Sequence, residues 1–135
     1  MTSEPGMSDS IRHKGMRVGD HAETRRSYSP DDIAAFHALA GEPGAAHDSV
    51  PEPLIGALFS YLLGVDLPGF GTNYLKQEMQ FEQPAPIGVP LIARVEITRL
   101  RPDKHLVDLA TTCRDEDGTV YCRGRALVLA KDVGA

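Results

Sequence analysis

The sequence predicts an α+β domain in which an antiparallel sheet encloses one apolar helix. The first observation is that Leu54–Gly64 carries no charge and has large apolar residues on nearly every side of an α-helix, which is typical of an interior helix. The second is that, from Thr72 onward, apolar and polar residues alternate with a period of two, as in strands with one buried face. Helical and extended segments separated in this way favour an α+β architecture.

The central helix has a second feature, a stripe of small residues on one face. Gly56, Ser60 and Gly64 recur at four-residue spacing. Small side chains let a sheet or a ligand approach the helix backbone closely; we favour packing on a sheet, with a ligand as the alternative. At the rise of an α-helix the segment is about 16 Å long, too short to cross a bilayer.

Upstream of this helix, the sequence predicts an edge strand and a first helix. His21–Tyr28 is mixed polar and suits an edge strand. Ser29 then offers a helix cap, Pro30 suits the first turn, and the aspartates that follow complement the positive end of the helix dipole. Gly41 is expected to end that helix, and a loop follows to Pro53.

Downstream, four segments have the alternation of strands. In the first, Gln77 shares the apolar face with Leu75, Met79 and Phe81. The second has Leu91, Ala93, Val95 and Ile97 on one face, and the last two are Leu106–Arg114 and Thr119–Ala130. Asp117-Gly118 is a hairpin signal between the last two.

Size and charge restrict the class of protein. A chain of 135 residues fits one domain, which we expect over residues 16–132 after a flexible tail at residues 1–15. The net charge of −5 argues against a nucleic-acid binder, since phosphate binding needs a basic surface. No apolar run is long enough to span a membrane and none resembles a signal core, so a cytoplasmic protein is expected.

The cysteines and histidines do not have the spacing of a metal site. Cys113 and Cys122 do not have the spacing of metal ligands and the five histidines are scattered, so we expect no metal and no other cofactor. If Asp117-Gly118 forms a two-residue turn, Cys113 opposes Cys122 across the hairpin. Two buried, reduced thiols are the favoured interpretation and a disulfide is the alternative.

A set of residues then carries a resemblance to a known family. The sequence resembles the MaoC-like, (R)-specific enoyl-CoA hydratase group of hotdog proteins over roughly residues 19–130, most specifically over residues 58–88. The matching residues in that stretch are Leu58-Phe59-Ser60, Leu63-Gly64, Leu67-Pro68-Gly69, Gly71, Tyr74-Leu75, Gln77, Phe81, Pro84 and Gly88. The resemblance implies a hotdog fold, a homodimer joined sheet edge to sheet edge, and an acyl thioester of coenzyme A or of acyl-carrier protein as substrate.

The family's catalytic loop has the pattern SGDxNPxxH just after the first helix. The matching run here is Ala40-Gly41-Glu42-Pro43-Gly44-Ala45-Ala46-His47. The resemblance therefore implies Glu42 in place of the catalytic aspartate and His47 as the catalytic histidine. Two departures stand out: Gly44-Ala45 replaces Asn-Pro, and Pro51-Glu52-Pro53 replaces the His-Gly-Met that precedes the central helix in the family.

Three further residues are expected to bind substrate. In the family a glycine N–H before the central helix holds the thioester carbonyl; Glu52 retains an N–H at that place, whereas Pro53 has none. Ser60 matches a serine that faces the family's pocket, and its alternative is a bond to the helix backbone. Gln77 needs a partner if buried, either substrate or a second subunit. Arg94, Arg99, Arg101 and Lys104, or Arg123 and Arg125, are weaker candidates for meeting the phosphates of a carrier.

These residues suit the reversible hydration of a trans-2-enoyl thioester. A base must take a proton from water as it attacks C3, an acid must protonate C2, and donors must hold the charge that develops on the carbonyl oxygen. A carboxylate and an imidazole can share one water and serve both proton roles. We therefore expect an enoyl-thioester hydratase or dehydratase; the alternatives are a non-catalytic thioester-binding subunit and a thioesterase on the same fold.

Overall fold

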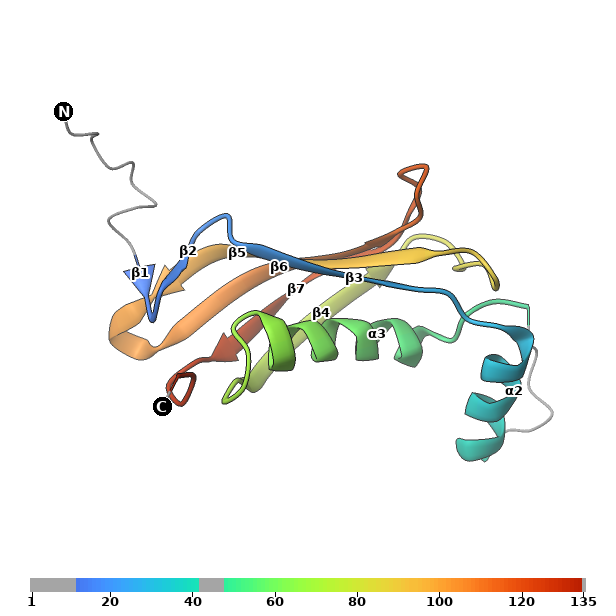
Figure 1. Ribbon diagram of the computed structural model, residues 1–135, viewed down its shortest axis with the longest axis horizontal. Coiled ribbons are helices and arrows are strands. Elements are labelled where there is room, and N and C mark those ends of the chain that lie inside the picture. The colour runs from blue at the N-terminus through green and yellow to red at the C-terminus, as the bar shows by residue number, and fades with distance from the viewer. Residues whose placement is uncertain (1–11, 42–47, 135) are drawn as a thin grey trace.

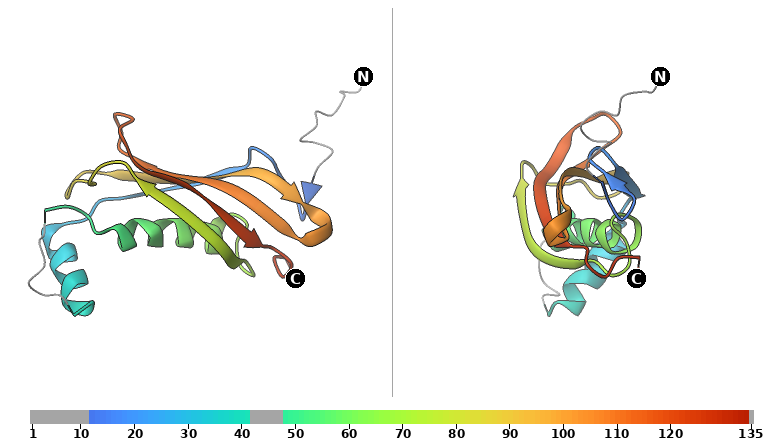
Figure 2. Two further views of the ribbon diagram at one scale, coloured as in Figure 1. Left: turned by 180° about the vertical axis from the view of Figure 1, so that it is seen from behind. Right: turned by 90° about the vertical axis from the view of Figure 1, so that its left-hand side faces the viewer.

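One five-stranded antiparallel sheet curls around a helix in the computed structural model, which describes residues 12–41 and 48–134 (Figures 1 and 2). The strand order is β3-β5-β6-β7-β4. The strands are β3 (His21–Arg26), β4 (Asn73–Phe81), β5 (Leu91–Arg101), β6 (Leu106–Arg114) and β7 (Val120–Leu129), and the helix on the concave side is α3 (Glu52–Tyr61). The predicted α+β architecture is confirmed, with β3 at a sheet edge as expected.

A short hairpin precedes the sheet. β1 (Arg12–His13) pairs with β2 (Met16–Arg17), and both His13 and Met16 are buried. The tail assigned to residues 1–15 lies mainly outside the described residues, and its end at residues 12–15 belongs to this hairpin. No helix in the described ranges is long and apolar enough to cross a membrane.

Helix α2 (Pro30–Leu39) begins and ends as the sequence predicts. The Ser29 hydroxyl accepts the N–H of Asp32 at 3.1 Å, and the Asp32 carboxylate accepts the N–H of Ser29 at 2.9 Å. This reciprocal capping satisfies two N–H groups that a helix start otherwise leaves free. Gly41, with φ +80°, follows the last turn. In Figure 1, α2 stands away from the sheet at the amino-terminal end of α3.

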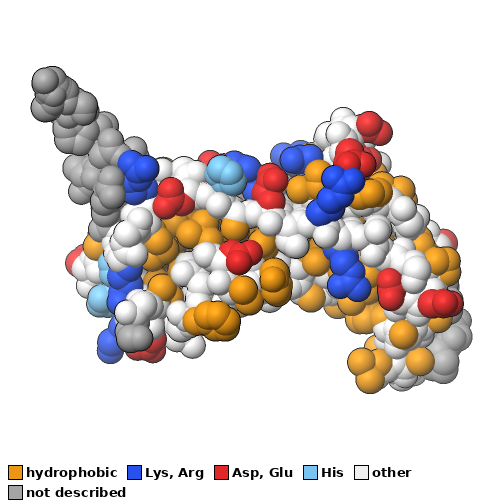
Figure 3. Space-filling model, in the orientation of Figure 1, with side chains coloured by type: hydrophobic (Ala, Val, Ile, Leu, Met, Phe, Trp, Pro, Cys, Tyr) orange, Lys and Arg blue, Asp and Glu red, His pale blue; other side chains and the backbone are white. Residues whose placement is uncertain are grey.

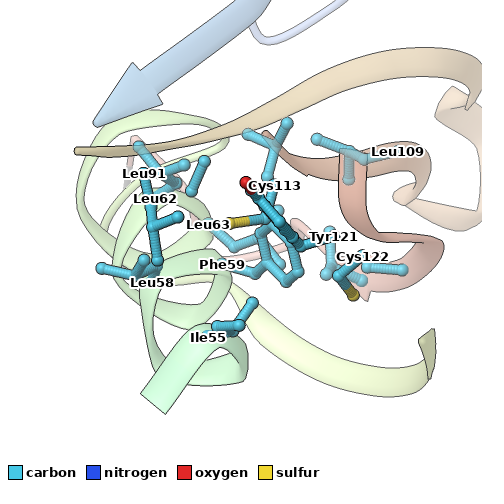
Figure 4. Close-up of a cluster of buried hydrophobic side chains, with 14 of the residues drawn as sticks. Ile55, Leu58, Phe59, Leu62, Leu63, Leu91, Leu109, Cys113, Tyr121 and Cys122 are labelled. Atoms are coloured by element: carbon cyan, nitrogen blue, oxygen red, sulfur yellow. The ribbon is translucent and has the colours of Figure 1, made fainter. Parts of the chain in front are cut away.

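Helix α3 supplies one wall of the hydrophobic core. Ile55, Phe59, Leu62 and Leu63 are 1% exposed or less. Figure 4 shows Phe59 and Leu63 directed toward Cys113 of β6. The helix was predicted over residues 54–64. The observed α3 starts two residues earlier and continues from Leu62 as a π-helical turn, η1 (Leu62–Asp66), which ends before Leu67-Pro68.

The expectation that this helix is interior on every side is wrong for the single chain. Ala57, Ser60, Tyr61 and Val65 are exposed, Tyr61 by 52%. A curled sheet covers only the side of a helix that faces it, so the far side of α3 is left open to solvent, a ligand or a second molecule. Of the small-residue stripe, Gly56 meets the sheet, since an added Cβ would lie 3.4 Å from the Met79 side chain.

Strand β4 is bent, and its backbone packs closely against that of β7. Gly124 of β7 permits this, because a Cβ there would lie 2.0 Å from the Glu78 carbonyl oxygen of β4. Gln77 and Met79 face α3 as expected, but a bulge between Tyr74 and Lys76 removes Leu75 from that alternation and leaves it 54% exposed. The predicted inward position of Leu75 is therefore wrong, because a bulge resets the pleat.

The two cysteines are cross-strand partners and both are free thiols. Figure 4 shows their sulfur atoms apart. Burial raises the pKa of Cys113 to about 12 and that of Cys122 to about 11, so neither forms the reactive thiolate near neutral pH. The favoured reading of two buried thiols is confirmed. Within the described residues, no three His, Cys, Asp or Glu side chains gather as a metal site requires.

The turn between β6 and β7 is built around one carboxylate. Asp115 accepts the N–H of Asp117 at 2.9 Å, the N–H of Thr119 at 3.0 Å and the Tyr121 hydroxyl at 2.6 Å. The hairpin differs from the simple two-residue turn that was expected, because a bulge follows Cys113. The Tyr121 hydrogen bond, with help from the backbone N–H groups, holds the pKa of Asp115 below its ordinary value of 3.8.

Asp115 should therefore make the stability of the folded protein depend on pH. Its folded pKa is depressed, so its contribution is present above the ordinary value of 3.8 and is lost as the pH falls through the folded value. We expect Asp115→Asn to lower the midpoint of thermal unfolding at pH 7 by roughly 5 °C. The difference from wild type should shrink below about pH 4, as circular dichroism melts can measure. A difference that is the same at pH 7 and pH 3 would contradict this role.

Candidate functional site

The two proposed proton-transfer residues, Glu42 and His47, lie outside the described residues. The chain on either side of them is fixed by structure. Before them, α2 ends at Leu39; after them, the N–H of Val50 donates to the carbonyl of Ala85 at 2.9 Å. The segment that carries both residues therefore joins the end of α2 to the start of α3.

Glu52 is the first residue of α3, and its backbone is available to a ligand. No carbonyl of the described chain accepts its N–H, and Pro51 before it provides no side-chain cap. Such free N–H groups and the helix dipole make a helix start attractive to a developing negative charge. A hollow of about 320 Å³ opens here, bounded by Ser49, Glu52 and Ile55 on one side and by Phe81 and Pro84 on the other.

Ser60 lies in the middle of α3 on its exposed side, and its hydroxyl is close enough to Tyr74 of β4 to act on the pKa of that phenol. Burial raises the pKa of Tyr74, and Ser60 partly opposes that shift. The two hydroxyls therefore form a polar pair between helix and edge strand. Tyr74 could not be assigned a role from the sequence, because the bulge beside it hides its orientation from a simple count of alternation.

Gln77 is half-buried on β4, on the face that meets α3, where it stands opposite Ala126 of β7. Its Nε2 is fully buried and has no hydrogen-bond partner in the described part of the chain. Leaving an amide without a partner costs about 1–3 kcal/mol, so a ligand or another subunit that supplied an acceptor would be favoured. This matches the two alternatives for Gln77 that the sequence left open.

The arginines considered as phosphate contacts lie mainly on the outer face of the sheet. Val95 and Ile97 of β5 point into the core, so the alternating Arg94 and Glu96 point away from α3. Most of these side chains are occupied by acids: Arg94 pairs with Glu23 and Glu96, Arg101 with Asp108, Arg123 with Glu82 and Arg125 with Glu78. A carrier phosphate would have to displace a carboxylate at each of these four arginines.

Comparison with curated proteins finds close relatives. The chain is 32% identical over 128 residues to an (R)-specific enoyl-CoA hydratase of Aeromonas caviae, covering 85% of this chain and 96% of that protein. It is 30% identical over 126 residues to a 3-hydroxybutyryl-CoA dehydratase of Methylorubrum extorquens, covering 84% of this chain and 80% of the relative. No family model matches the sequence.

Solved structures give the same result for the fold. The (R)-hydratase PhaJ1 of Pseudomonas aeruginosa, in its unliganded form, superposes with a TM-score of 0.78 at 29% sequence identity. The match covers 85% of this chain and 82% of that one. The chain thus has the fold of a solved hydratase over most of its length.

Proposed function

This chain belongs to the (R)-specific enoyl-CoA hydratases of hotdog fold, and we propose that it reversibly adds water to a trans-2-enoyl thioester of coenzyme A, with Glu42 and His47 as its proton-transfer pair. The identity to curated hydratases over most of the chain is the observation that carries the reaction type. The match of Glu42 and His47 to the family's catalytic motif, in the stretch of sequence that joins α2 to α3, supports their role.

In the proposed reaction, the substrate carbonyl lies against the amino terminus of α3. The N–H of Glu52 donates a hydrogen bond to the thioester oxygen, which gains negative charge as water attacks C3. Glu42 and His47 hold that water: one takes its proton as the C3–O bond forms, and the other delivers a proton to C2. The product is a 3-hydroxyacyl thioester, and dehydration runs through the same groups in reverse.

Ser60 and Gln77 are proposed to bind the acyl part of the substrate. The Ser60 hydroxyl has a neighbour in Tyr74 but remains on the exposed side of α3, where it can also reach a ligand. The Gln77 amide supplies a donor whose burial without a partner is otherwise unfavourable. Both residues project into the seam between α3 and β4 and so would line the same side of the substrate.

The reaction is tested with the purified full chain and crotonyl-CoA. Hydration should remove the absorbance of the conjugated enoyl thioester without releasing free thiol. Thiol release at a matching rate would instead identify a thioesterase. Saturable binding of crotonyl-CoA with no loss of absorbance would identify a non-catalytic binding subunit, and either result would overturn the proposed function.

We further propose that two copies pair through β4. This strand lies at the sheet edge, and the N–H and C=O groups on its side away from β7 pair with no other described strand. Tyr74, Leu75 and Met79 are 39%, 54% and 38% exposed along it. A second copy paired along β4 would cover these side chains.

Leu75→Asp should therefore weaken dimer formation by at least about tenfold, because it would bury an unpaired charge at the seam. Sedimentation equilibrium across a range of protein concentrations measures the effect. Leu39→Asp is the matched control, since Leu39 is 90% exposed on α2 and away from β4. A monomeric wild type, or equal weakening by both variants, would rule out pairing through β4.

A further inference from the structure

A groove runs in the angle between α2, α3 and the end of β3. One hollow of about 320 Å³ follows α3 past Tyr61, and a second of about 250 Å³ follows α2 past Phe36. Arg26, Tyr28 and Leu54 line both, so the two hollows meet around these side chains. In Figure 3, hydrophobic side chains cover α3 and α2 on this side, and Lys or Arg side chains lie over the end of β3 next to them.

Arg26 stands at this junction without a carboxylate partner. Its guanidinium carbon lies 4.7 Å from the centre of the Tyr28 ring, and no Asp or Glu of the described chain forms an ion pair with it. Hydrogen bonds with Ser29 lower the pKa of Asp32, and the charge of Arg26 contributes less. The Asp32 carboxylate points to the start of α2, where it accepts the N–H of Ser29 at 2.9 Å. Stacking on an aromatic ring orients a guanidinium while leaving its edge donors free.

The neighbouring arginine provides the contrast. Arg25 stands opposite the half-buried Ile92 on the outer face of the sheet and forms an ion pair with Glu116. Arg26 stands opposite the buried Leu91, on the side of α3. The two adjacent arginines therefore lie on opposite faces of the sheet. Arg25 is neutralised by Glu116, and Arg26 faces an apolar groove.

We propose that Arg26 binds the phosphates of the coenzyme A thioester and that the groove beside it receives the pantetheine arm, an inference that rests on the proposed function. A long arm of low charge ending in phosphates matches an apolar groove with one available guanidinium at its junction. The groove also reaches the start of α3, because Leu54, which lines both hollows, lies two residues after Glu52, whose N–H is proposed to hold the thioester carbonyl.

Arg26→Ala should raise the KM for crotonyl-CoA about tenfold while leaving kcat unchanged, since it removes a charge-assisted contact remote from the reacting atoms. The KM for crotonyl-pantetheine, which has no phosphate, should not change. Arg25→Ala is the matched control and should behave as wild type with both substrates. Arg26→Lys should recover part of the affinity, because it keeps the charge and loses the planar fork.

Binding of free coenzyme A and of pantetheine, measured by titration calorimetry on the same variants, separates this inference from the proposed function. If wild type hydrates neither substrate but Arg26→Ala still weakens coenzyme A about tenfold and pantetheine not at all, the phosphate contact stands and the proposed reaction fails. Equal effects of Arg26→Ala on both ligands, equal effects of Arg25→Ala and Arg26→Ala, or no effect on coenzyme A would overturn the inference. Thermal melts check that each variant is folded.

Discussion

Glu42→Gln is expected to lower kcat for the hydration of crotonyl-CoA by about a thousandfold, with little change in KM. General acid–base groups typically contribute 10² to 10⁴ to a rate, and the amide can neither accept the proton that water loses nor deliver one to C2. The change preserves size and hydrogen-bonding shape, so the loss would belong to the chemical step. Steady-state kinetics at the absorbance of the enoyl thioester measures it.

The matched control is Asp48→Asn, which makes the same chemical change at an exposed position next to His47. It should retain activity within about threefold, as surface changes outside a reaction centre usually do. His47→Gln should resemble Glu42→Gln, and the double variant should lose little more than either single variant, because the two groups act on one water. Full activity in Glu42→Gln, or an equal loss in Asp48→Asn, would remove Glu42 from the mechanism.

Phe59→Ala is expected to destabilise the fold by about 3–5 kcal/mol, the usual cost of removing a buried aromatic ring. Phe59 is 0% exposed and fills the space between α3 and the β6–β7 strands, where Figure 4 shows it beside Leu63 and Cys113. Its removal would leave a cavity that a curled sheet cannot close without disturbing its pairing. Urea unfolding followed by circular dichroism gives the change in free energy.

Phe70→Ala is the control for this measurement, because it deletes the same ring from a loop where Phe70 is 79% exposed. We expect it to change the free energy of unfolding by less than about 0.5 kcal/mol. If Phe59→Ala cost no more than Phe70→Ala, the helix would not be the centre of the core.

Local sequence signals predicted most elements of this fold, although not the β1–β2 hairpin or the π-helical turn after α3. Ser29 and Asp32 cap α2 as their spacing indicates, because capping depends only on residues within one turn. The alternation over Leu106–Arg114 gives β6 its observed bounds and its buried face. The pairing of Cys113 with Cys122 was also foreseen, although the observed hairpin reaches it through a bulge and not through an even count from the turn.

Contacts between distant segments were not predictable in the same way. The bulge at Leu75 depends on how β4 must bend to follow β7, and Gly124 permits that bend from a position far along the chain. The Ser60–Tyr74 hydroxyl pair and the unpartnered Gln77 amide depend on the register of β4 against α3. The roles of Glu42 and His47 came from the family motif, and their geometry lies outside the described residues.

The sequence by itself determined an amphipathic sheet, an apolar helix to fill it and the motif that names the family, since each is encoded in the order of neighbouring residues. Only the tertiary structure decided which side of the helix stays open and which arginine faces the helices without an ion-pair partner in the described chain. Arg25 and Arg26 are adjacent residues of the same type, so the sequence does not distinguish them. The register of β3 against β5 places one side chain on each face of the sheet.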